Sequence, residues 1–318
     1  MNVLQQLAEE DIVPQLVLQH RGISKLKSTY VDTLPELVNE HTGRIHSRFV
    51  QTGTATGRLS SRDPNLQNIP IRDEAGRRIR KAFVPQEGWK LVSADYSQIE
   101  LVVLAHLSGD PELQEAFRSG SDVHSRTGAL IFGVKPEDVS AEQRRIAKTI
   151  NFGVMYGMSG YRLSQELKIP RARADEFISA YFNRYAKIQE FIHETVASTE
   201  QKGYSETMLG RRRSIPGINS RNRTEKSGAE RIAVNTPIQG TAADIVKLAM
   251  ISIDRRIREE KLDLRMLLQI HDELIFEAPE HKTEEYGRLI RSEMESAVQL
   301  SIPLKVSVEV GDSWGELH

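Results

Sequence analysis

The chain has 318 residues, of which 39% are hydrophobic, and its formal net charge is −1. Such a chain can bury a large core and divide into subdomains. It contains no cysteine, which excludes disulfides, thiolate nucleophiles and cysteine-based zinc sites. The charge neither indicates nor excludes nucleic-acid binding, because a basic groove could be local. No signal-peptide pattern or apolar run of membrane-spanning length is present, so we expect a cytoplasmic protein that does not contact membranes.

The first 40 residues carry apolar side chains at helical spacing. Val3 and Leu7 belong to one predicted helix, and Ile12 and Leu16 belong to the next. This segment shows no chemistry of its own.

A polar segment follows between residues 42 and 70. Ile45, Ser47 and Phe49 alternate with charged residues, which predicts a short half-buried strand. The rest reads as a turn-rich loop, for which a plain surface role is the usual interpretation. It nevertheless carries side chains of the types that donate to minor-groove acceptors and to phosphates: Arg58, Asn65, Gln67 and Asn68.

The first acidic motif lies between a predicted strand and a predicted helix. Residues 89–95 form a mostly apolar strand that ends at Asp95, and residues 99–107 form an apolar helix. A lone aspartate at such a junction is more often a helix cap or an ion-pair partner than a metal ligand.

The second acidic motif favours the metal-ligand interpretation of Asp95. Residues 266–270 and 274–277 predict two strands joined by a hairpin with Asp272 at its tip. Carboxylates at the ends of adjacent strands could hold two Mg²⁺ ions, with Mn²⁺ as a substitute, because Mg²⁺ prefers oxygen ligands and substrate phosphates. Two such ions would support phosphoryl transfer by positioning and charge.

Residues 144–156 predict one helix with marked ends. Ser140 and Gln143 form a capping box at its start, and Gly157 follows its last residue. Four side chains spaced by four residues form a stripe along it: Arg144, Lys148, Phe152 and Tyr156. Alone, such a stripe favours a solvated face beside core aromatics. Next to two acidic motifs, it indicates a surface for a phosphate tail and a stacked base.

Two further groups are candidates for binding. His124 precedes this helix, although a lone histidine is as often structural. Arg231, Asn235 and Gln239 are four residues apart on a predicted helix, and amides in an otherwise apolar segment need partners. A helix from Thr283 to about Leu300 and a strand over residues 304–310 close the chain, so the fold class is predicted to be α+β.

Three stretches resemble the motifs of family A DNA polymerases of the bacterial polymerase I type. Arg144–Tyr156 is similar to the nucleotide-binding fingers helix of that family. Residues 95–101, Asp-Tyr-Ser-Gln-Ile-Glu-Leu, and residues 269–273, Gln-Ile-His-Asp-Glu, are similar to its two acidic motifs, in the expected order. The resemblance extends from about Ser24 to Trp314.

The resemblance implies a polymerase hand, with an antiparallel palm sheet and a helical fingers insertion. Residues 1–40 would be a remnant of the thumb or of connecting helices, residues 41–105 the first part of the palm, 106–258 the fingers, and 259–318 the second part of the palm. The thumb would be truncated, and no exonuclease domain would be present.

The family also implies roles for single residues. Asp95, Asp272 and the main-chain carbonyl of Tyr96 would bind the metals, and Glu273 would support them. Lys148 would bind the triphosphate and protonate the departing pyrophosphate. The implied dNTP-binding residues are Arg144, Lys148, Phe152, Tyr156, Glu100, His124 and Gln98. The implied DNA-binding residues are Arg58, Asn65, Gln67, Asn68, Arg231, Asn235, Gln239 and His271. One departure is Val102, where the family usually carries arginine, which puts a basic contact near the primer terminus in doubt.

The resulting prediction is a monomeric DNA-templated DNA polymerase core that uses primer-template DNA and dNTPs. Two alternatives stay open. One is a single-subunit RNA polymerase, against which Glu100 and Phe152 argue. The other is a truncated fragment that binds primer-template with little or no turnover.

Overall fold

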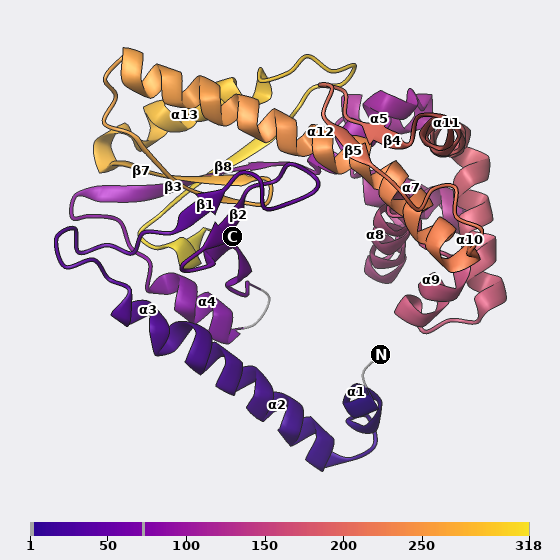
Figure 1. Ribbon diagram of the computed structural model, residues 1–318, viewed down its shortest axis with the longest axis horizontal. Coiled ribbons are helices and arrows are strands. Elements are labelled where there is room, and N and C mark those ends of the chain that lie inside the picture. Colours follow the sequence, from indigo (N-terminus) through magenta and orange to yellow (C-terminus); the bar gives the residue numbers. More distant parts are fainter. Residues whose placement is uncertain (1–2, 72–73, 318) are drawn as a thin grey trace.

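The computed structural model describes residues 3–71 and 74–317, and it has two parts joined by one long helix (Figure 1). One part is built on an antiparallel sheet and the other is helical, which confirms the predicted α+β class. In the described residues, no helix combines the length and apolar character that a membrane span requires.

The N-terminal helices confirm the helical prediction between residues 3 and 36, and residues 1–2 lie outside the described residues. They are α1 (Val3–Leu7), α2 (Ile12–Leu26), a π-helix (Lys27–Val31) and α3 (Thr33–Glu36). Asp11 caps α2 by accepting a hydrogen bond from the Val13 amide. α2 extends away from the sheet and buries none of its residues (Figure 1). The segment is anchored at Tyr30, whose hydroxyl donates to the Asn68 carbonyl at 2.8 Å.

The central sheet has the strand order β6-β7-β3-β8, with every pair antiparallel. Its strands are β3 (Trp89–Tyr96), β6 (Arg265–Ile270), β7 (Glu273–Pro279) and β8 (Val306–Gly311). The predicted strand at residues 89–95 and the predicted hairpin are therefore confirmed. α13 (Thr283–Glu295) packs against β3 and β8, and α4 (Glu74–Lys81) lies near the C-terminal 3-10 turn (Trp314–Glu316).

A two-stranded sheet carries the polar loop. β1 (Arg48–Val50) pairs with β2 (Ser60–Arg62), and a 3-10 turn (Leu66–Asn68) follows. The strand predicted to include Ile45 starts later than expected, because Ile45 makes an isolated bridge to Val38 instead.

The helical part contains seven helices in the described chain. They are α5 (Ile99–Ser108), α6 (Pro111–Arg118), α7 (Val123–Phe132), α8 (Ala141–Met155), α9 (Gly160–Leu167), α10 (Arg171–Arg184) and α11 (Ala186–Lys202). A short 3-10 turn at Pro136–Asp138 also lies in this part, whereas the one at Glu280–Lys282 lies between β7 and α13. Phe177, Tyr181 and Tyr185 are buried in the core of this part, whereas Phe182 is half-buried.

The long helix α12 (Arg223–Glu259) connects the two parts (Figure 1). Pro237 lies within it and has no amide hydrogen to donate to the Ala233 carbonyl. The Ser205 hydroxyl donates to that carbonyl at 2.8 Å, so the interruption is satisfied by β4 (Tyr204–Glu206) of the neighbouring β4–β5 hairpin. β5 (Arg212–Ser214) is the second strand of this hairpin.

The last predicted helix is shorter than expected. α13 ends at Glu295 rather than near Leu300, because the chain turns to bury Ile302 and Leu304 before β8 pairs with β3. The Glu295 carboxylate accepts a hydrogen bond from the Val306 amide at 3.0 Å and fixes this return.

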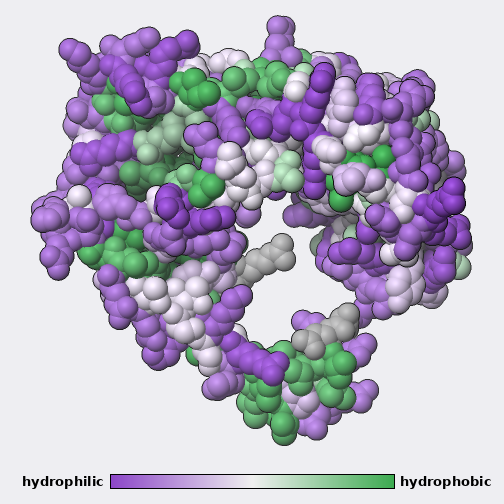
Figure 2. All heavy atoms as spheres, in the orientation of Figure 1, coloured by the Kyte–Doolittle hydropathy of each residue, from purple (hydrophilic) through white to green (hydrophobic). Residues whose placement is uncertain are grey.

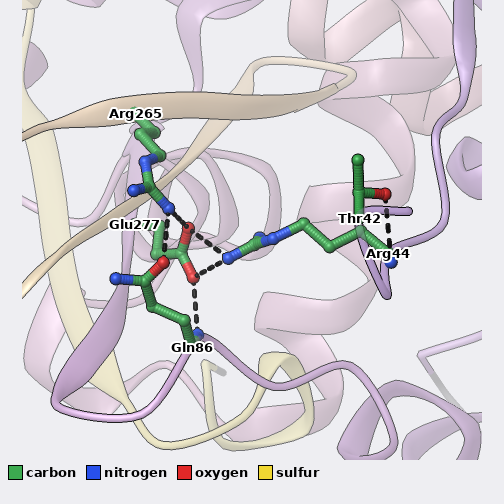
Figure 3. A network of polar contacts seen from close by, with 5 residues as sticks. All are labelled: Thr42, Arg44, Gln86, Arg265 and Glu277. Carbon is green, nitrogen blue, oxygen red and sulfur yellow. Dashed lines mark hydrogen bonds and ion pairs between the residues drawn. The ribbon is translucent and has the colours of Figure 1, made fainter. Parts of the chain in front are cut away.

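A buried carboxylate fixes the loop before β1 against the sheet (Figure 3). Glu277 of β7 is fully buried, and its oxygens accept from Arg44 Nη2 at 2.8 and 3.0 Å, Arg265 Nη1 at 3.2 Å and the Gln86 amide at 2.6 Å. Burial alone would raise the pKa of Glu277, but these hydrogen bonds outweigh it and lower the pKa.

Candidate active site

The two acidic motifs meet at one edge of the central sheet. Asp95 lies near the end of β3, directly opposite Glu273 of β7. The amide of Tyr96 donates to the carbonyl of Asp272 at 3.4 Å, which ties the two motifs together. Gln98 and His271 both have a φ of 55°, a left-handed conformation that non-glycine residues adopt rarely. The chain therefore makes a sharp, strained turn after β3, at Gln98, and another between β6 and β7, at His271.

Glu273 is not a solvated residue of the hairpin tip. It is the first residue of β7 and only 6% exposed, because its position opposite Asp95 turns its side chain into the packed sheet. The Ser93 hydroxyl donates to its carboxylate at 2.5 Å.

Asp272 lies in a largely dry environment, with a side chain that is 25% exposed. Burial raises its pKa above the usual value, and the Glu100 carboxylate adds to this effect, whereas the charges of Arg58 and His271 oppose it. The Arg58 Nη2 atom lies 3.5 Å from Asp272 Oδ1.

Arg58 also binds the first helix after β3. Its Nη2 atom donates to Glu100 Oε1 at 2.5 Å, and the Tyr156 hydroxyl donates to the other oxygen of that carboxylate. Burial and the Glu100 charge both raise the pKa of Tyr156, so its phenol stays protonated and donates. Gln239 of α12 forms a hydrogen bond with the same phenol. The polar loop, α5, the end of α8 and the hairpin therefore converge on one polar cluster.

The helix α8 has the predicted ends. Ser140 and Gln143 form the capping box, and Gly157, at a φ of 67°, follows the C-cap Tyr156. Arg144 and Lys148 are exposed along it. Arg144 uses its Nε atom for an ion pair with Asp122, which caps α7.

The aromatic half of the stripe is half-buried. The rings of Phe152 and Tyr156 stack with centroids 6.5 Å apart and an interplanar angle of 19°. Each ring therefore packs on the core with one side and keeps part of its surface open.

His124 lies beneath the stripe rather than on its surface. It is 2% exposed, and its Nδ1 atom is 3.0 Å from the side-chain nitrogen of Asn151. Burial lowers the pKa of His124 to about 4, with the charges of Arg144 and Lys148 acting in the same direction and Asp122 against them. The ring is therefore neutral at physiological pH and packs 5.7 Å from Phe152, centroid to centroid.

The polar loop divides into bonded and exposed side chains. The side-chain Nε2 atom of Gln67 donates to the carbonyls of Leu59 at 3.3 Å and Gln269 at 3.0 Å, and so links the loop to β6. Asn65 caps the 3-10 turn through the Gln67 amide, and Asn68 is exposed.

The three α12 side chains that the sequence predicts to bind differ in exposure. Arg231 is exposed, and Asn235 and Gln239 are half-buried. The Oδ1 atom of Asn235 is buried and accepts no hydrogen bond from any described residue. Val102 lies in the core of α5, so it presents an apolar contact where the family usually presents a charge.

The donors at the sheet edge suit a hard cation that shares its ligands with a substrate. Residues 3–71 and 74–317 contain no cluster of three or more histidine, cysteine or acidic side chains that could hold a metal alone. The oxygen donors at this edge include the carboxylates of Asp95 and Asp272 and the main-chain carbonyls beside them. Such a set fits Mg²⁺, which keeps waters and binds substrate phosphates.

Several contacts at this site carry no local signal in the sequence. Arg58 and Asp272 are more than 200 positions apart, and Ser93 and Glu273 are 180 apart. The pairing of Asp122 with Arg144 spans only 22 positions, because Asp122 caps the start of α7 and Arg144 lies in the first turn of the next helix, α8.

Comparisons with known proteins agree with this arrangement. The family described as DNA polymerase family A matches residues 1–316. The thermostable DNA polymerase I of Thermus thermophilus is 53% identical over 312 residues, which are 98% of this chain and 37% of that protein. The DNA polymerase I of Deinococcus radiodurans is 51% identical over 314 residues, 99% of this chain and 33% of that protein. The chain therefore spans about a third of the length of these curated relatives.

A solved structure is similar over nearly the whole chain. It is described as the POL domain of Pol1 from M. smegmatis in complex with DNA primer-template and dNTP. The TM-score is 0.93 at 48% sequence identity, covering 98% of this chain and 55% of that one. On the family match and on these relatives, the chain belongs to DNA polymerase family A.

Proposed function

We propose that this chain catalyses DNA-templated DNA synthesis, adding dNTPs to a primer 3′-hydroxyl with release of pyrophosphate. The observation that carries the proposal is the convergence of Asp95 and Asp272 at one sheet edge, next to the Arg58–Glu100–Tyr156 cluster. The relatives named DNA polymerase I, and the solved polymerase domain with primer-template and dNTP, support the same reaction.

In this proposal Asp95, Asp272 and the Tyr96 carbonyl hold two Mg²⁺ ions, which Mn²⁺ can replace. The bound ions would supply charge stabilisation to an in-line phosphoryl transfer. Glu273 supports this edge from β7, since it lies opposite Asp95 and is fixed by Ser93.

The helix α8 receives the nucleotide. Arg144 and Lys148 bind the triphosphate through charge-assisted hydrogen bonds, and Lys148 donates the proton that the pyrophosphate takes. Phe152 stacks on the sugar and base, and Tyr156 guards the template position. Gln98, at the strained turn after β3, would contact the nucleotide, whereas the buried His124 supports the stripe from below.

Glu100 selects the sugar. Its carboxylate is held between Arg58 and Tyr156, so it forms a fixed wall that leaves no room for a 2′-hydroxyl. A fixed wall discriminates better than a mobile side chain, because moving it would break both bonds.

The duplex would lie in the open space between the sheet, the helical part and α2 (Figure 2). Donors that contact it are proposed on the polar loop, on α12 and at the hairpin tip: Arg58, Asn65, Gln67, Asn68, Arg231, Asn235, Gln239 and His271. Asn235 is a strong candidate, because its buried Oδ1 atom accepts no hydrogen bond within the described chain. Gln67 would have to keep or exchange its bonds to Leu59 and Gln269.

We also propose the subdomain boundaries given by the resemblance. Their support is that β3, from residues 41–105, pairs with β7 and β8, from residues 259–318, whereas α6–α11 pack with one another. A monomer and a cytoplasmic location belong to the same proposal.

Primer extension tests the function directly. Wild-type protein with a labelled primer-template and Mg²⁺ should extend the primer with dNTPs and discriminate strongly against NTPs. Preference for NTPs would favour a single-subunit RNA polymerase. Tight binding without extension would favour a non-catalytic fragment.

A further inference from the structure

We infer that Asp244 and Arg211 are positioning residues, which hold the Gly57–Arg58 turn against α12 so that Arg58 reaches Glu100 and Asp272. This inference rests on the proposed function. It concerns two residues that touch neither the acidic motifs nor the α8 stripe.

Asp244 anchors the arrangement from within α12. Its side chain is 8% exposed. Its Oδ1 atom accepts from Arg211 Nε at 2.9 Å and Nη2 at 2.6 Å, and its Oδ2 atom accepts from the Thr207 hydroxyl at 2.9 Å. A guanidinium held through two nitrogens on one carboxylate has a fixed plane as well as a fixed position.

The turn that carries Arg211 is closed on itself. The Arg211 amide donates to the Thr207 hydroxyl at 3.1 Å, and the Thr207 amide donates to the Arg211 carbonyl at 2.9 Å. The Met208 amide donates to the Thr241 hydroxyl of α12 at 3.0 Å. The hairpin turn, the guanidinium and α12 therefore move as one unit.

The polar loop presses directly on this unit, and two glycines permit the contact. Gly57 has a φ of 82°, and a Cβ there would lie 2.5 Å from Arg211 Nε and 2.8 Å from Arg211 Cζ. A Cβ at Gly240 would lie 2.4 Å from the Thr207 methyl and 3.5 Å from the Thr56 carbonyl oxygen. The backbone of Gly57 therefore lies against the Arg211 guanidinium, and the Thr56 carbonyl lies close to Gly240 of α12.

Arg58 is the residue immediately after this contact. The Thr54 hydroxyl donates to its carbonyl at 2.7 Å and closes the loop. Its Nε atom is buried and has no hydrogen-bond partner in the described chain, and its Nη2 atom makes the contacts to Glu100 and Asp272. Since nothing described binds the guanidinium at Nε, the backbone position of residue 57 decides where its far end lies. Misplacement by about 1 Å at a reacting site can reduce a rate by about 100-fold.

A purely structural ion pair makes a different prediction. Removing one partner of a buried pair lowers stability, but it does not by itself change a site that still folds. Asp244→Asn keeps the side-chain volume and removes the charge that holds Arg211. Glu293→Gln is the matched control, because Glu293 binds Arg256 and Ser252 towards the other end of α12, away from the loop.

The test combines kinetics with a signal that does not need turnover. Asp244→Asn should reduce the single-turnover extension rate by about 10-fold and leave the dNTP KM within about 2-fold. In an Arg58→Ala background it should cause no further loss, because both changes then act through the same side chain. The ¹⁵N-arginine NMR signal of the Arg58 Nε–H group, assigned with Arg58→Lys, should shift in Asp244→Asn. In Glu293→Gln, neither the rate nor this signal should change.

An unchanged Arg58 signal in folded Asp244→Asn, or a loss that adds fully to that of Arg58→Ala, would overturn the inference. If Asp244→Asn does not fold, Arg211→Lys is the second variant, since lysine keeps the charge but cannot make the two-nitrogen contact. Absence of extension by wild-type protein would instead defeat the proposed function, and the NMR signal would still decide the positioning role.

Discussion

The sheet edge and the α8 stripe differ in how firmly their charged groups are held. At the sheet edge, Glu100 and Asp272 are mostly buried and share Arg58, and Glu273 is fixed by Ser93. Along α8, the Arg144 side chain is 46% exposed, and its described ion pair, with Asp122, leaves its terminal nitrogens available. The charged groups of the first region are held by contacts within the chain, whereas those of the second remain free to adjust to the proposed phosphates. This difference predicts that the two regions control different kinetic constants.

The largest expected effect comes from the carboxylates at the sheet edge. Asp95→Asn or Asp272→Asn should reduce turnover by about 10³-fold or more, because each deletes a proposed ion ligand worth several kcal/mol at the transition state. Primer-template binding should persist. Asp312→Asn, at an exposed ion pair with Lys90 away from this edge, is the control. Near wild-type extension by either test variant would contradict the two-carboxylate assignment.

The next largest effect is on the free energy of unfolding, which ionised Glu277 raises and ionised Asp272 lowers. The pKa of Glu277 is lowered, so its stabilisation is present above the unfolded-state pKa and is lost as pH falls through the lower folded value. Glu277→Gln should therefore cost about 3 kcal/mol at pH 7, because it leaves two arginines without their buried partner. The pKa of Asp272 is raised, so its contribution has the opposite sign and is unfavourable at pH 7.

Denaturant unfolding at pH 7 measures both signs in one experiment. Glu277→Gln should unfold at a lower denaturant concentration than wild type, and Asp272→Asn at a higher one. A stabilised Glu277→Gln would contradict the lowered pKa of Glu277, and a destabilised Asp272→Asn would contradict the raised pKa of Asp272.

Sugar selection should depend on the volume of Glu100 more than on its charge. Glu100→Ala should admit ribonucleotides, lowering the dNTP-to-NTP ratio of kcat/KM by about 10²-fold, because it removes the wall under the sugar. Glu100→Gln keeps the volume and should retain most of the selection. Equal loss in both variants would show that charge, and not space, discriminates.

Smaller effects are expected along α8. Arg144→Ala should raise the dNTP KM by about 10-fold, since it removes a proposed charge-assisted phosphate contact. Lys148→Ala should raise the KM similarly and also lower kcat, since it removes the proposed proton donor as well. Arg145→Ala is the matched control, because Arg145 pairs with Glu142 and lies off the stripe. A similar KM change in the control would mean that the helix contributes general charge rather than a specific contact.

Much of the fold was predictable because its signals are local. The apolar strand before Asp95, the hairpin around Asp272 and the capping box at Ser140 all follow from periodicity or spacing and are confirmed. The end of α13 was not predictable in this way. It depends on pairing between β8 and β3, and the helical spacing of apolar residues carries no information about that pairing.

The site was predictable in its residues but not in its connections. The acidic motifs and the stripe stand out by residue type, and their roles stay predictions. The bonds that organise them join distant segments, as Arg58 does with Asp272 and Asp244 does with Arg211. The burial of Glu273 likewise comes from strand register rather than from its position next to a hairpin turn.

The most direct test measures single-turnover incorporation for Asp272→Asn and Arg144→Ala side by side, over a range of dNTP concentrations. A sheet edge that performs the chemistry and a stripe that holds the phosphates predict separate effects. Asp272→Asn should lose the maximal rate by about 10³-fold with little change in apparent dNTP affinity, and Arg144→Ala should mainly lose affinity by about 10-fold. Loss of affinity alone in Asp272→Asn, with the maximal rate intact, would contradict this division of roles.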